Sequence, residues 1–336
     1  MYKSKRTNKI YKTLIIFLLV ILFPSGSYSI QRKDEIPTQL VVGGELLELD
    51  IETTKLMVYT NKGIKSKLKQ YDLVESIQGT LVEEVFNKAS LNNVRKEDIL
   101  KLCLKMKTND KLSIKILRNN KEVNLLLGKE EVHPSYFVNE IPFSASLTYI
   151  NPKNSDFGAV AHSIDVNANE EILSTNGDMY LCNLSHLSKS SKKEVGNMYG
   201  DKVYNRQGEI KYIDEFGLKG ILDRKDILKN AQVYDVGKKE EVSLGHAQVL
   251  IKENESTPKI AYDINIIKTS NQNKPEICSF EFRVVDSRLI EKYGGIVSGM
   301  SGCPIIQNGK IIGALSHVIC NDTSRGTGVY IQWMLE

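Results

Sequence analysis

Ser301 is the residue of this sequence with the clearest potential for chemistry, because it stands in a glycine-flanked corner, Gly299-Met-Ser-Gly302. Flanking glycines let the backbone bend sharply and leave its amides uncovered, which an oxyanion hole beside a nucleophilic serine requires. Two apolar runs follow within residues 304–315, joined by Asn308-Gly309. This pattern predicts a tight β-hairpin, since a type I′ turn needs positive φ at both central residues. The alternative is an incidental serine in a tight turn, and the hairpin favours the functional interpretation.

A nucleophilic serine needs a base, and five histidines are candidates: His133, His162, His186, His246 and His317. His133 lies before a proline and His186 lies in a polar stretch, so we expect both side chains to be solvated. His246 lies in an alternating strand, where we expect its side chain to point outward. His162 ends a strand of small residues, 157–160, and enters a turn. His317 closes the hairpin that follows Ser301. The pattern favours His162 slightly and leaves His317 open.

The base in turn needs a carboxylate that holds its tautomer and stabilises the imidazolium. Four aspartates are candidates for this role: Asp165, Asp263, Asp286 and Asp322. Asp165 lies three residues after His162, and Asp286 lies fifteen residues before Ser301. The residue pattern alone does not choose among the four.

The five cysteines are widely spaced and form no C-x-x-C pair, which argues against a zinc ribbon or a thioredoxin motif. Cys182 and His186 have metal-compatible spacing, but without a second pair we expect ordinary packing and neither metal nor other cofactor. Cys303, two residues after Ser301, is an alternative nucleophile, although the amides of the corner favour the serine. In an exported chain Cys303 could also pair with Cys320 across the hairpin.

The N-terminus has the features of an export signal. Five basic residues within positions 3–12 precede the apolar run Leu14 to Phe23, and small residues lead to Ser29. The run is short for a spanning helix, which needs about 20 apolar residues. We therefore expect residues 1–29 to be a signal peptide or a membrane anchor and the remainder to be exported. The net charge of +4 is too small to argue for a nucleic-acid partner.

Residues 30–45 are polar, contain Pro37 and Gly43-Gly44, and are typical of a linker. Residues 46–130 predict a small α+β domain: two strands, a helix over 96–106 with apolar residues on one face, and a hairpin over 112–127. This order is that of PDZ domains, which capture an extended peptide or a C-terminus as an added strand. A spacer domain that binds nothing is the alternative.

From residue 134 to residue 336 the pattern changes to many short strands separated by turns. Such spacing argues for an antiparallel sandwich or barrel. The expected fold class is therefore mainly β, with the small α+β domain preceding it.

The C-terminal stretch resembles the SpoIVB serine peptidase family, stage IV sporulation protein B of endospore-forming bacteria. The resemblance rests on residues 294–318, on Val284-Val-Asp286-Ser-Arg-Leu289 before them and on Tyr330-Ile-Gln-Trp-Met-Leu335 after them. It implies a trypsin-like double β-barrel peptidase domain after the PDZ-like domain. The implied triad is His162, Asp286 and Ser301, the implied oxyanion hole is formed by the amides of Gly299 and Ser301, and the strand 315–318 would pair with the substrate backbone.

The chain departs from the family pattern at two positions: Ala161 stands where a glycine usually precedes the histidine, and Cys303 stands where a serine is usual. The resemblance implies a serine endopeptidase that acts between the mother-cell and forespore membranes. It would cleave a membrane-associated regulatory protein, trigger processing of a late mother-cell sigma factor and cut itself near its N-terminus. A non-catalytic exported PDZ scaffold and a divergent second-copy protease with another substrate are the alternatives. A metal-dependent hydrolase is disfavoured because no ligand cluster is evident.

Overall fold

The computed structural model describes residues 36–59, 66–85, 101, 111–119, 121–128, 131–166, 170–171, 176–192, 194–203, 205–223, 226–228, 231–319 and 321–336. The predicted export signal lies outside these residues, as does nearly all of the predicted helix over 96–106. Within the described part of the chain, no helix is long and apolar enough to cross a membrane.

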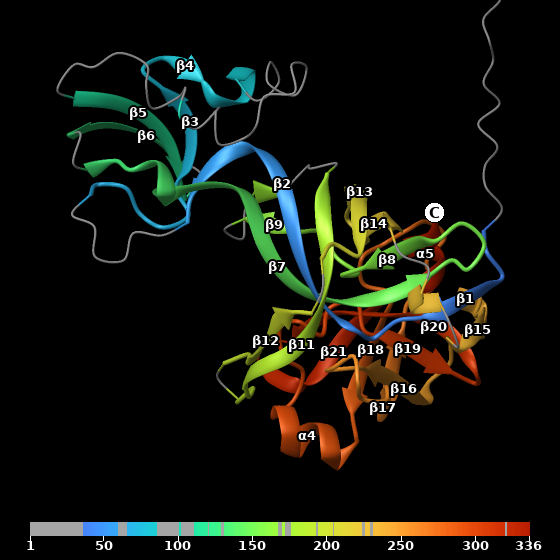
Figure 1. The fold of residues 1–336 in the computed structure, drawn as a ribbon. Helices are drawn as coiled ribbons and strands as arrows, with labels where there is room; N and C mark the ends of the chain where they lie inside the picture. Colours follow the sequence, from blue (N-terminus) through green and yellow to red (C-terminus); the bar gives the residue numbers. More distant parts are fainter. Residues whose placement is uncertain are drawn as a thin grey trace, which may run out of the picture. The chain divides into compact units, whose positions relative to one another are not determined.

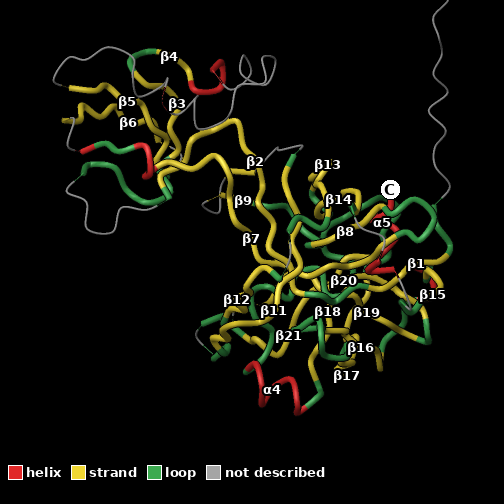
Figure 2. Tube along the Cα trace, in the orientation of Figure 1, coloured by secondary structure: helices red, strands yellow, loops and turns green. Residues whose placement is uncertain are grey.

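Strands make up most of the fold, and Figure 2 shows few helical turns among them, which confirms the mainly β prediction. The α-helices α4 (Ser287–Tyr293) and α5 (Ile331–Leu335) are short. The strands are β1 (Gln39–Val42), β2 (Leu46–Val58), β3 (Leu73–Ile77), β4 (Thr80–Leu81), β5 (Lys111–Arg118), β6 (Lys121–Gly128), β7 (Phe137–Ile150), β8 (Asp156–Ala159), β9 (Asp165–Val166), β10 (Glu170–Glu171), β11 (Gly177–Ser188), β12 (Asn197–Lys202), β13 (Gly208–Asp214), β14 (Gly217–Leu222), β15 (Val233–Val236), β16 (Gly245–Ile251), β17 (Ile260–Thr269), β18 (Phe280–Val284), β19 (Pro304–Gln307), β20 (Lys310–Ile319) and β21 (Asp322–Tyr330).

Six antiparallel strands close the first barrel in the order β2, β7, β8, β14, β13, β11 and back to β2. Each strand places alternate side chains inside, so a closed sheet collects one apolar set at its centre. That set forms a single buried cluster, with Leu49, Phe157 and Met179 among its members. The first barrel therefore has a core of its own.

Six further strands close a second barrel in the order β16, β17, β18, β21, β20, β19 and back to β16. Its core contains Ile264, Phe282 and Ile305. The predicted hairpin is the β19–β20 pair, and φ is 51° at Asn308 and 75° at Gly309. Both values are positive, as the Asn-Gly turn requires. The two closed rings form a double β-barrel, whose strands lie in the lower part of Figure 1.

The predicted domain boundaries need correction at the N-terminal side. Strand β1 falls in the predicted linker, yet it pairs with β7 and β15. The first half of β2 falls in the predicted PDZ-like domain, yet Leu47 and its neighbours pair with β7 and β11 of the first barrel. The reason is burial, because Leu40, Leu49 and Ile51 are fully buried in the barrel cores. Residues 39–52 therefore belong to the barrels.

The second half of β2 continues into a smaller sheet formed with β3, β4, β5 and β6. The predicted hairpin over 112–127 is the β5–β6 pair, and a third apolar cluster that includes Val74, Ile114 and Ile116 packs beneath it. A buried carboxylate, Asp72, accepts hydrogen bonds of 2.7 and 2.6 Å from the guanidinium of Arg118. Assignment of this sheet to a PDZ domain stays a prediction.

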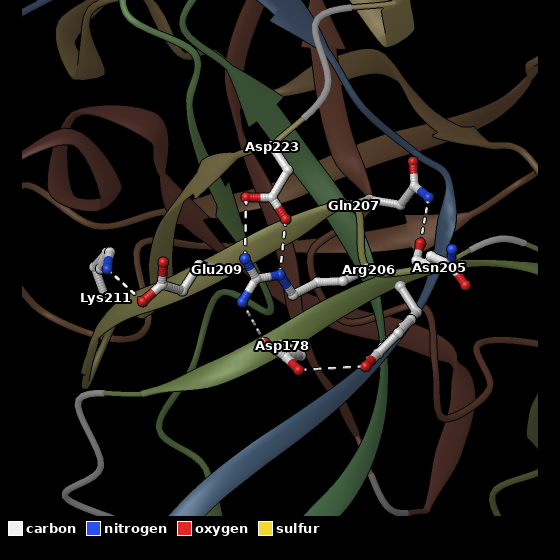
Figure 3. Close-up of polar contacts among 8 residues, drawn as sticks. Asp178, Asn205, Arg206, Gln207, Glu209, Lys211 and Asp223 are labelled. Carbon is white, nitrogen blue, oxygen red and sulfur yellow. Dashed lines mark hydrogen bonds and ion pairs between the residues drawn. The ribbon is translucent and has the colours of Figure 1, made fainter. Parts of the chain in front are cut away.

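An arginine on the first barrel ties together three segments that lie apart in the sequence (Figure 3). Arg206, between β12 and β13, donates to Asp223 after β14 at 2.7 Å and to Asp178 of β11 at 3.2 Å. The three side chains are partly exposed, so the ion pairs add little to the free energy of unfolding. Their effect is to fix the loop before β13 against the neighbouring strands.

Candidate active site

The corner that carries Ser301 is held by the backbone of β7. Ser146 donates its amide to the Ser301 carbonyl at 2.8 Å and its hydroxyl to the Gly299 carbonyl at 2.8 Å. Thr148 donates its hydroxyl to the Gly302 carbonyl at 2.7 Å. These bonds draw the carbonyl oxygens of the corner toward β7 and fix its conformation.

Glycine is required at two positions of this corner. Gly299 has φ of 97° and Gly302 has φ of 93°, values that side chains of L-residues rarely tolerate. A Cβ at Gly302 would also lie 2.2 Å from the carbonyl oxygen of Ser146. Within the described residues, the backbone amides of Gly299 and Ser301 donate no hydrogen bond. Two uncovered amides two residues apart can bind an oxyanion.

The turn that carries His162 is strained. The Ala161 amide donates to the Ala159 carbonyl at 3.1 Å, which closes a γ-turn around Val160 at φ of 81°. A γ-turn with positive φ is rare, and a β-branched residue makes it more costly. Ala161 follows with φ of 65°, so the alanine occupies a position that favours glycine. This is the position at which the family resemblance implies a glycine.

The turn fits because two glycines pack against it. A Cβ at Gly217 would lie 2.7 Å from the amide nitrogen of Ala161, and a Cβ at Gly302 would lie 2.6 Å from the amide nitrogen of Val160. Val160 and Ala161 are both fully buried. The corner that carries the serine and the turn that carries the histidine are therefore packed directly on each other.

The His162 ring is positioned from three sides. Its centroid lies 6.1 Å from that of Phe143 in an edge-on contact and 4.7 Å from that of His317. Its Nδ1 lies 2.5 Å from the carbonyl oxygen of Ser163. A carbonyl only accepts, so Nδ1 carries the hydrogen and Nε2 carries the lone pair in the neutral ring. A neutral imidazole with a lone pair on Nε2 can act as a base.

His162, Ser301 and His317 line one open cleft of about 490 Å³. The Ser301 hydroxyl donates to the carbonyl oxygen of Ser316 at 3.1 Å, and the Ser316 hydroxyl lies 2.8 Å from Nδ1 of His317. The remaining lining comes from the β11–β12 hairpin, from the loop before Ser301 and from β20: Ser188, Glu194, Val195, Gly196, Asn197, Tyr199, Ile296, Val297, Ser298, Leu315 and Val318. The cleft thus brings together the Ser301 hydroxyl and an imidazole pair, and Ser301 belongs to the corner with two uncovered amides.

The sequence pattern of the family described as SpoIVB peptidase S55 matches residues 139–335, more than half of the chain. The chain belongs to the SpoIVB peptidase S55 family. Membership makes it a serine endopeptidase and confirms the resemblance inferred from the sequence. The matched range covers the described parts of both barrels except β1 and β2.

Comparison with solved structures finds two proteases among its matches. The Rv3671c protease of M. tuberculosis in its active form is 13% identical, with a TM-score of 0.31 over 57% of this chain and 70% of that chain. The HtrA-type protease AlgW with a decapeptide is 10% identical, with a TM-score of 0.32 over 58% of this chain and 51% of that chain. Comparison with curated proteins finds no match.

The structure does not bring Asp286, the acid expected from the family resemblance, into this cleft. Its carboxylate caps the N-terminus of α4 and is held by the Arg288 guanidinium at 3.0 and 2.6 Å and by the Asp263 amide at 3.1 Å. The guanidinium of Arg288 holds the pKa of this buried carboxyl at about 2. The sequence carried a signal for the cap, because an aspartate precedes a helical stretch that ends at Gly294.

Two of the alternative acids, Asp263 and Asp322, are engaged outside the cleft. Asp263 accepts hydrogen bonds from His246 and Gln248, each at 3.0 Å, and Asp322 accepts from Ser324. Asp165 begins β9, three residues after the histidine, so its candidacy as the orienting acid stays a prediction. One contact of Nδ1 of His162 is the Ser163 carbonyl, at 2.5 Å.

Cys303 is a free thiol, fully buried behind the corner. Its Sγ lies 3.2 Å from the hydroxyl of Ser146. Burial raises the pKa of this thiol to about 12, so it stays protonated at neutral pH. The thiol is a packing group of the second barrel, in line with the assignment of Ser301 as nucleophile. Cys320, its possible disulfide partner, lies outside the described residues.

Proposed function

We propose that this peptidase is a sporulation endopeptidase in which Ser301 is the nucleophile and His162 is the general base. One observation carries the proposal: Ser301 and His162 line the same cleft, and the corner that carries Ser301 has two uncovered amides. Acyl transfer needs these three parts and no metal. Asp286 enters the proposal as a support for the corner, because the helix that it caps ends eight residues before Ser301.

The first step is attack on the scissile carbonyl. His162 Nε2 removes the proton of the Ser301 hydroxyl while Oγ bonds to the carbonyl carbon of the substrate. Rotation about χ1 of Ser301 releases its hydrogen bond to the Ser316 carbonyl and directs Oγ to the substrate. The carbonyl oxygen becomes an oxyanion and accepts hydrogen bonds from the amides of Gly299 and Ser301.

The second step breaks the peptide bond and frees the enzyme. His162 gives its proton to the leaving amine, the C–N bond breaks, and an acyl ester remains on Ser301. A water molecule then loses a proton to His162 and attacks the ester, and the proton returns to Oγ as the acid departs. The Ser163 carbonyl orients the ring through both steps by accepting from Nδ1.

An irregularity in β20 supports a place for the substrate backbone. The pairing of β20 with β21 shifts register between Leu315 and Val318, so Ser316 and His317 lie outside the regular ladder. The Ser316 carbonyl accepts from Ser301 and the His317 amide donates to Thr327. The other main-chain groups of these two residues would pair with an extended substrate strand, as the family resemblance implies for 315–318. The peptidase would therefore bind its substrate in an extended conformation.

The substrate that we propose is a membrane-associated regulatory protein whose cleavage triggers processing of a late mother-cell sigma factor. The family description names sporulation, and the N-terminal export signal would place the enzyme in the space between the two membranes, released or anchored. The PDZ-like sheet would hold a peptide or a C-terminus. Self-cleavage near the N-terminus would fall before Gln39, because β1 is already paired within the barrels.

The test is Ser301→Ala in the full-length chain, with two readouts. The first is covalent labelling by a fluorophosphonate, which reports an activated serine whatever the protein substrate. The second readout is the set of new protein N-termini that appear when membranes from sporulating cells are treated with wild type or with Ser301→Ala. We expect Ser301→Ala to abolish labelling and all cleavage, and Ser185→Ala, an exposed serine on the β11–β12 hairpin, to change neither. Labelling or cleavage that survives Ser301→Ala rules out this nucleophile.

A further inference from the structure

Strand β12 forms one wall of the cleft with alternate side chains. Asn197 and Tyr199 of β12 line the cleft, whereas Met198 between them is buried in the core of the second barrel. Alternation of this kind is what a strand with one face on the core and one face on a cleft produces. The side chain of Asn197 is therefore presented to the cleft by the backbone of β12.

The carboxamide of Asn197 is unusual because its oxygen is buried without a partner. Oδ1 has almost no exposed surface and accepts no hydrogen bond from any described residue. Buried side-chain acceptors in native proteins are nearly always satisfied, because desolvation without compensation is costly. Asn197 lines the cleft, so a rotation of its carboxamide that exposes Oδ1 would let a donor on a bound ligand satisfy this acceptor.

The same residue is fixed beside the corner that carries the nucleophile. Asn197 forms a parallel bridge with Ser298. In that bridge the Ser298 amide donates to the Gly196 carbonyl at 2.9 Å and the Met198 amide donates to the Ser298 carbonyl at 3.0 Å. Ser298 directly precedes Gly299, one of the two residues with an uncovered amide. The carboxamide thus projects from a strand that is hydrogen-bonded to the corner, which gives it a defined position relative to the oxyanion hole.

From this arrangement we propose that Asn197 is a substrate-binding residue whose Oδ1 accepts a hydrogen bond from a backbone N–H of the peptide substrate. The inference rests on the proposed function, since it takes the cleft as the peptide-binding site. A main-chain donor fits better than a charged side chain, because Oδ1 is buried and carries no charge. The contact adds a fixed point to a peptide that lies extended along the cleft.

The first experiment separates substrate binding from chemistry. Wild type, Asn197→Ala and Asn197→Val are compared for cleavage of fluorescein-labelled casein and for the rate of labelling by a small fluorophosphonate. Loss of one hydrogen bond to substrate predicts a roughly 10- to 100-fold fall in kcat/KM for casein. Labelling, which needs Ser301 but no extended peptide, should stay within about threefold of wild type. If wild type itself is not labelled, the proposed function fails and the inference falls with it.

The thermal midpoint supplies a readout that a merely structural role would change. Asn197→Val should leave the midpoint unchanged or raise it, because the substitution removes an orphan acceptor from a strand. Asn183→Val is the matched control: this asparagine of β11 accepts from the Glu255 amide at 2.8 Å outside the cleft. The control should lower the midpoint and leave casein cleavage intact. A lower midpoint with unchanged casein cleavage in Asn197→Val would overturn the proposal.

The second experiment identifies the donor. A fluorogenic peptide that carries the best-cleaved casein site is prepared with each backbone amide methylated in turn. Methylation at one position should reduce kcat/KM in wild type by about tenfold and in Asn197→Ala by less than about threefold, because the partner is already absent. Equal losses in both enzymes at every position would show that Oδ1 receives its hydrogen from water, not from substrate, and would overturn the proposal.

Discussion

The imidazole rings of His162 and His317 lie 4.7 Å apart between centroids and are tilted by 36°. One ring comes from the turn after β8 of the first barrel and the other from β20 of the second. Nδ1 of His317 is engaged with the hydroxyl of Ser316, whereas Nδ1 of His162 donates to a carbonyl. The two histidines that the sequence left in competition therefore line the same cleft as Ser301 and differ in their hydrogen bonding.

The first prediction assigns different roles to these rings. His162→Ala should lower kcat/KM for casein by at least about 100-fold, because a positioned general base contributes on the order of 10²–10⁴. His317→Phe should lower it by less than about tenfold, since a phenyl ring keeps the packing against His162. The rate of fluorophosphonate labelling serves as the second measurement. If His317→Phe proves as damaging as His162→Ala while the fold is intact, His317 is the base.

The second prediction concerns the thiol behind the corner. With a pKa of about 12, Cys303 is about one part in 10⁴ thiolate at pH 8, and the thiol is fully buried. Iodoacetamide at pH 8 should therefore leave casein cleavage unchanged. Cys303→Ser should retain most activity, because a hydroxyl can keep the contact with Ser146. Rapid inactivation that is lost in Cys303→Ser would instead indicate an accessible and reactive thiol.

The third prediction separates two roles for Asp286. Its pKa in the folded chain is about 2, below the ordinary value of 3.8, so its contribution to stability is present above about pH 4 and is lost as the pH falls toward 2. Asp286→Asn should lower the free energy of unfolding at pH 7 by about 1–2 kcal/mol. This figure is smaller than the full pKa shift would give, because Arg288 is largely exposed and solvent screens the ion pair. The difference from wild type should shrink at pH 2.5. Urea unfolding at both values measures it.

The activity of the same variant tests the acid expected from the family resemblance. Loss of the carboxylate that orients a catalytic histidine costs about 10⁴ in kcat. The structure places Asp286 on Arg288 and the Asp263 amide, so the variant should retain cleavage within about tenfold at 25 °C. Asp286→Glu is the companion variant, since it keeps the charge and changes the cap. A loss near 10⁴ in folded Asp286→Asn would place its carboxylate in the catalytic machinery.

Local signals in the sequence were enough to predict the residues at the centre of the site. The Asn308-Gly309 turn, the glycines beside Ser301 and the small residues before His162 each act within a few residues, and the structure places the serine and the histidine in one cleft. Pairings between distant segments were not predictable in the same way. Strand β1 looked like a linker because its partners, β7 and β15, lie about 100 and 190 residues away along the chain.

Two further features depend on surroundings that no spacing encodes. The left-handed backbone at Val160 is held by packing against Gly302, although valine resists that conformation. The role of Asn197 depends on an acceptor that has no partner, which is visible only once every neighbouring donor has been placed. Functional sites often break local preferences in this manner, so sequence reasoning misses them first.

The last prediction concerns the strain beneath the base. Ala161 has φ of 65°, and a left-handed residue other than glycine costs about 1–2 kcal/mol. Glycine removes that cost but loses roughly 0.5–1 kcal/mol through the freedom of the unfolded chain. The loss of a fully buried methyl costs a further ~0.8 kcal/mol. Ala161→Gly should therefore leave the free energy of unfolding within about 0.5 kcal/mol of wild type, and the thermal midpoint within roughly 2 °C.

Ala159→Gly is the control, because it makes the same change two residues earlier in a buried strand with no positive φ. There glycine brings only its entropic cost and a lost methyl contact, so the midpoint should fall. Casein cleavage by Ala161→Gly should stay within about twofold of wild type, since Gly217, Gly302 and the Phe143 contact still fix the turn and the ring. If both variants lower the midpoint equally, the backbone at Ala161 is not strained. A stable but inactive Ala161→Gly would mean that the alanine methyl itself holds His162 in its working position.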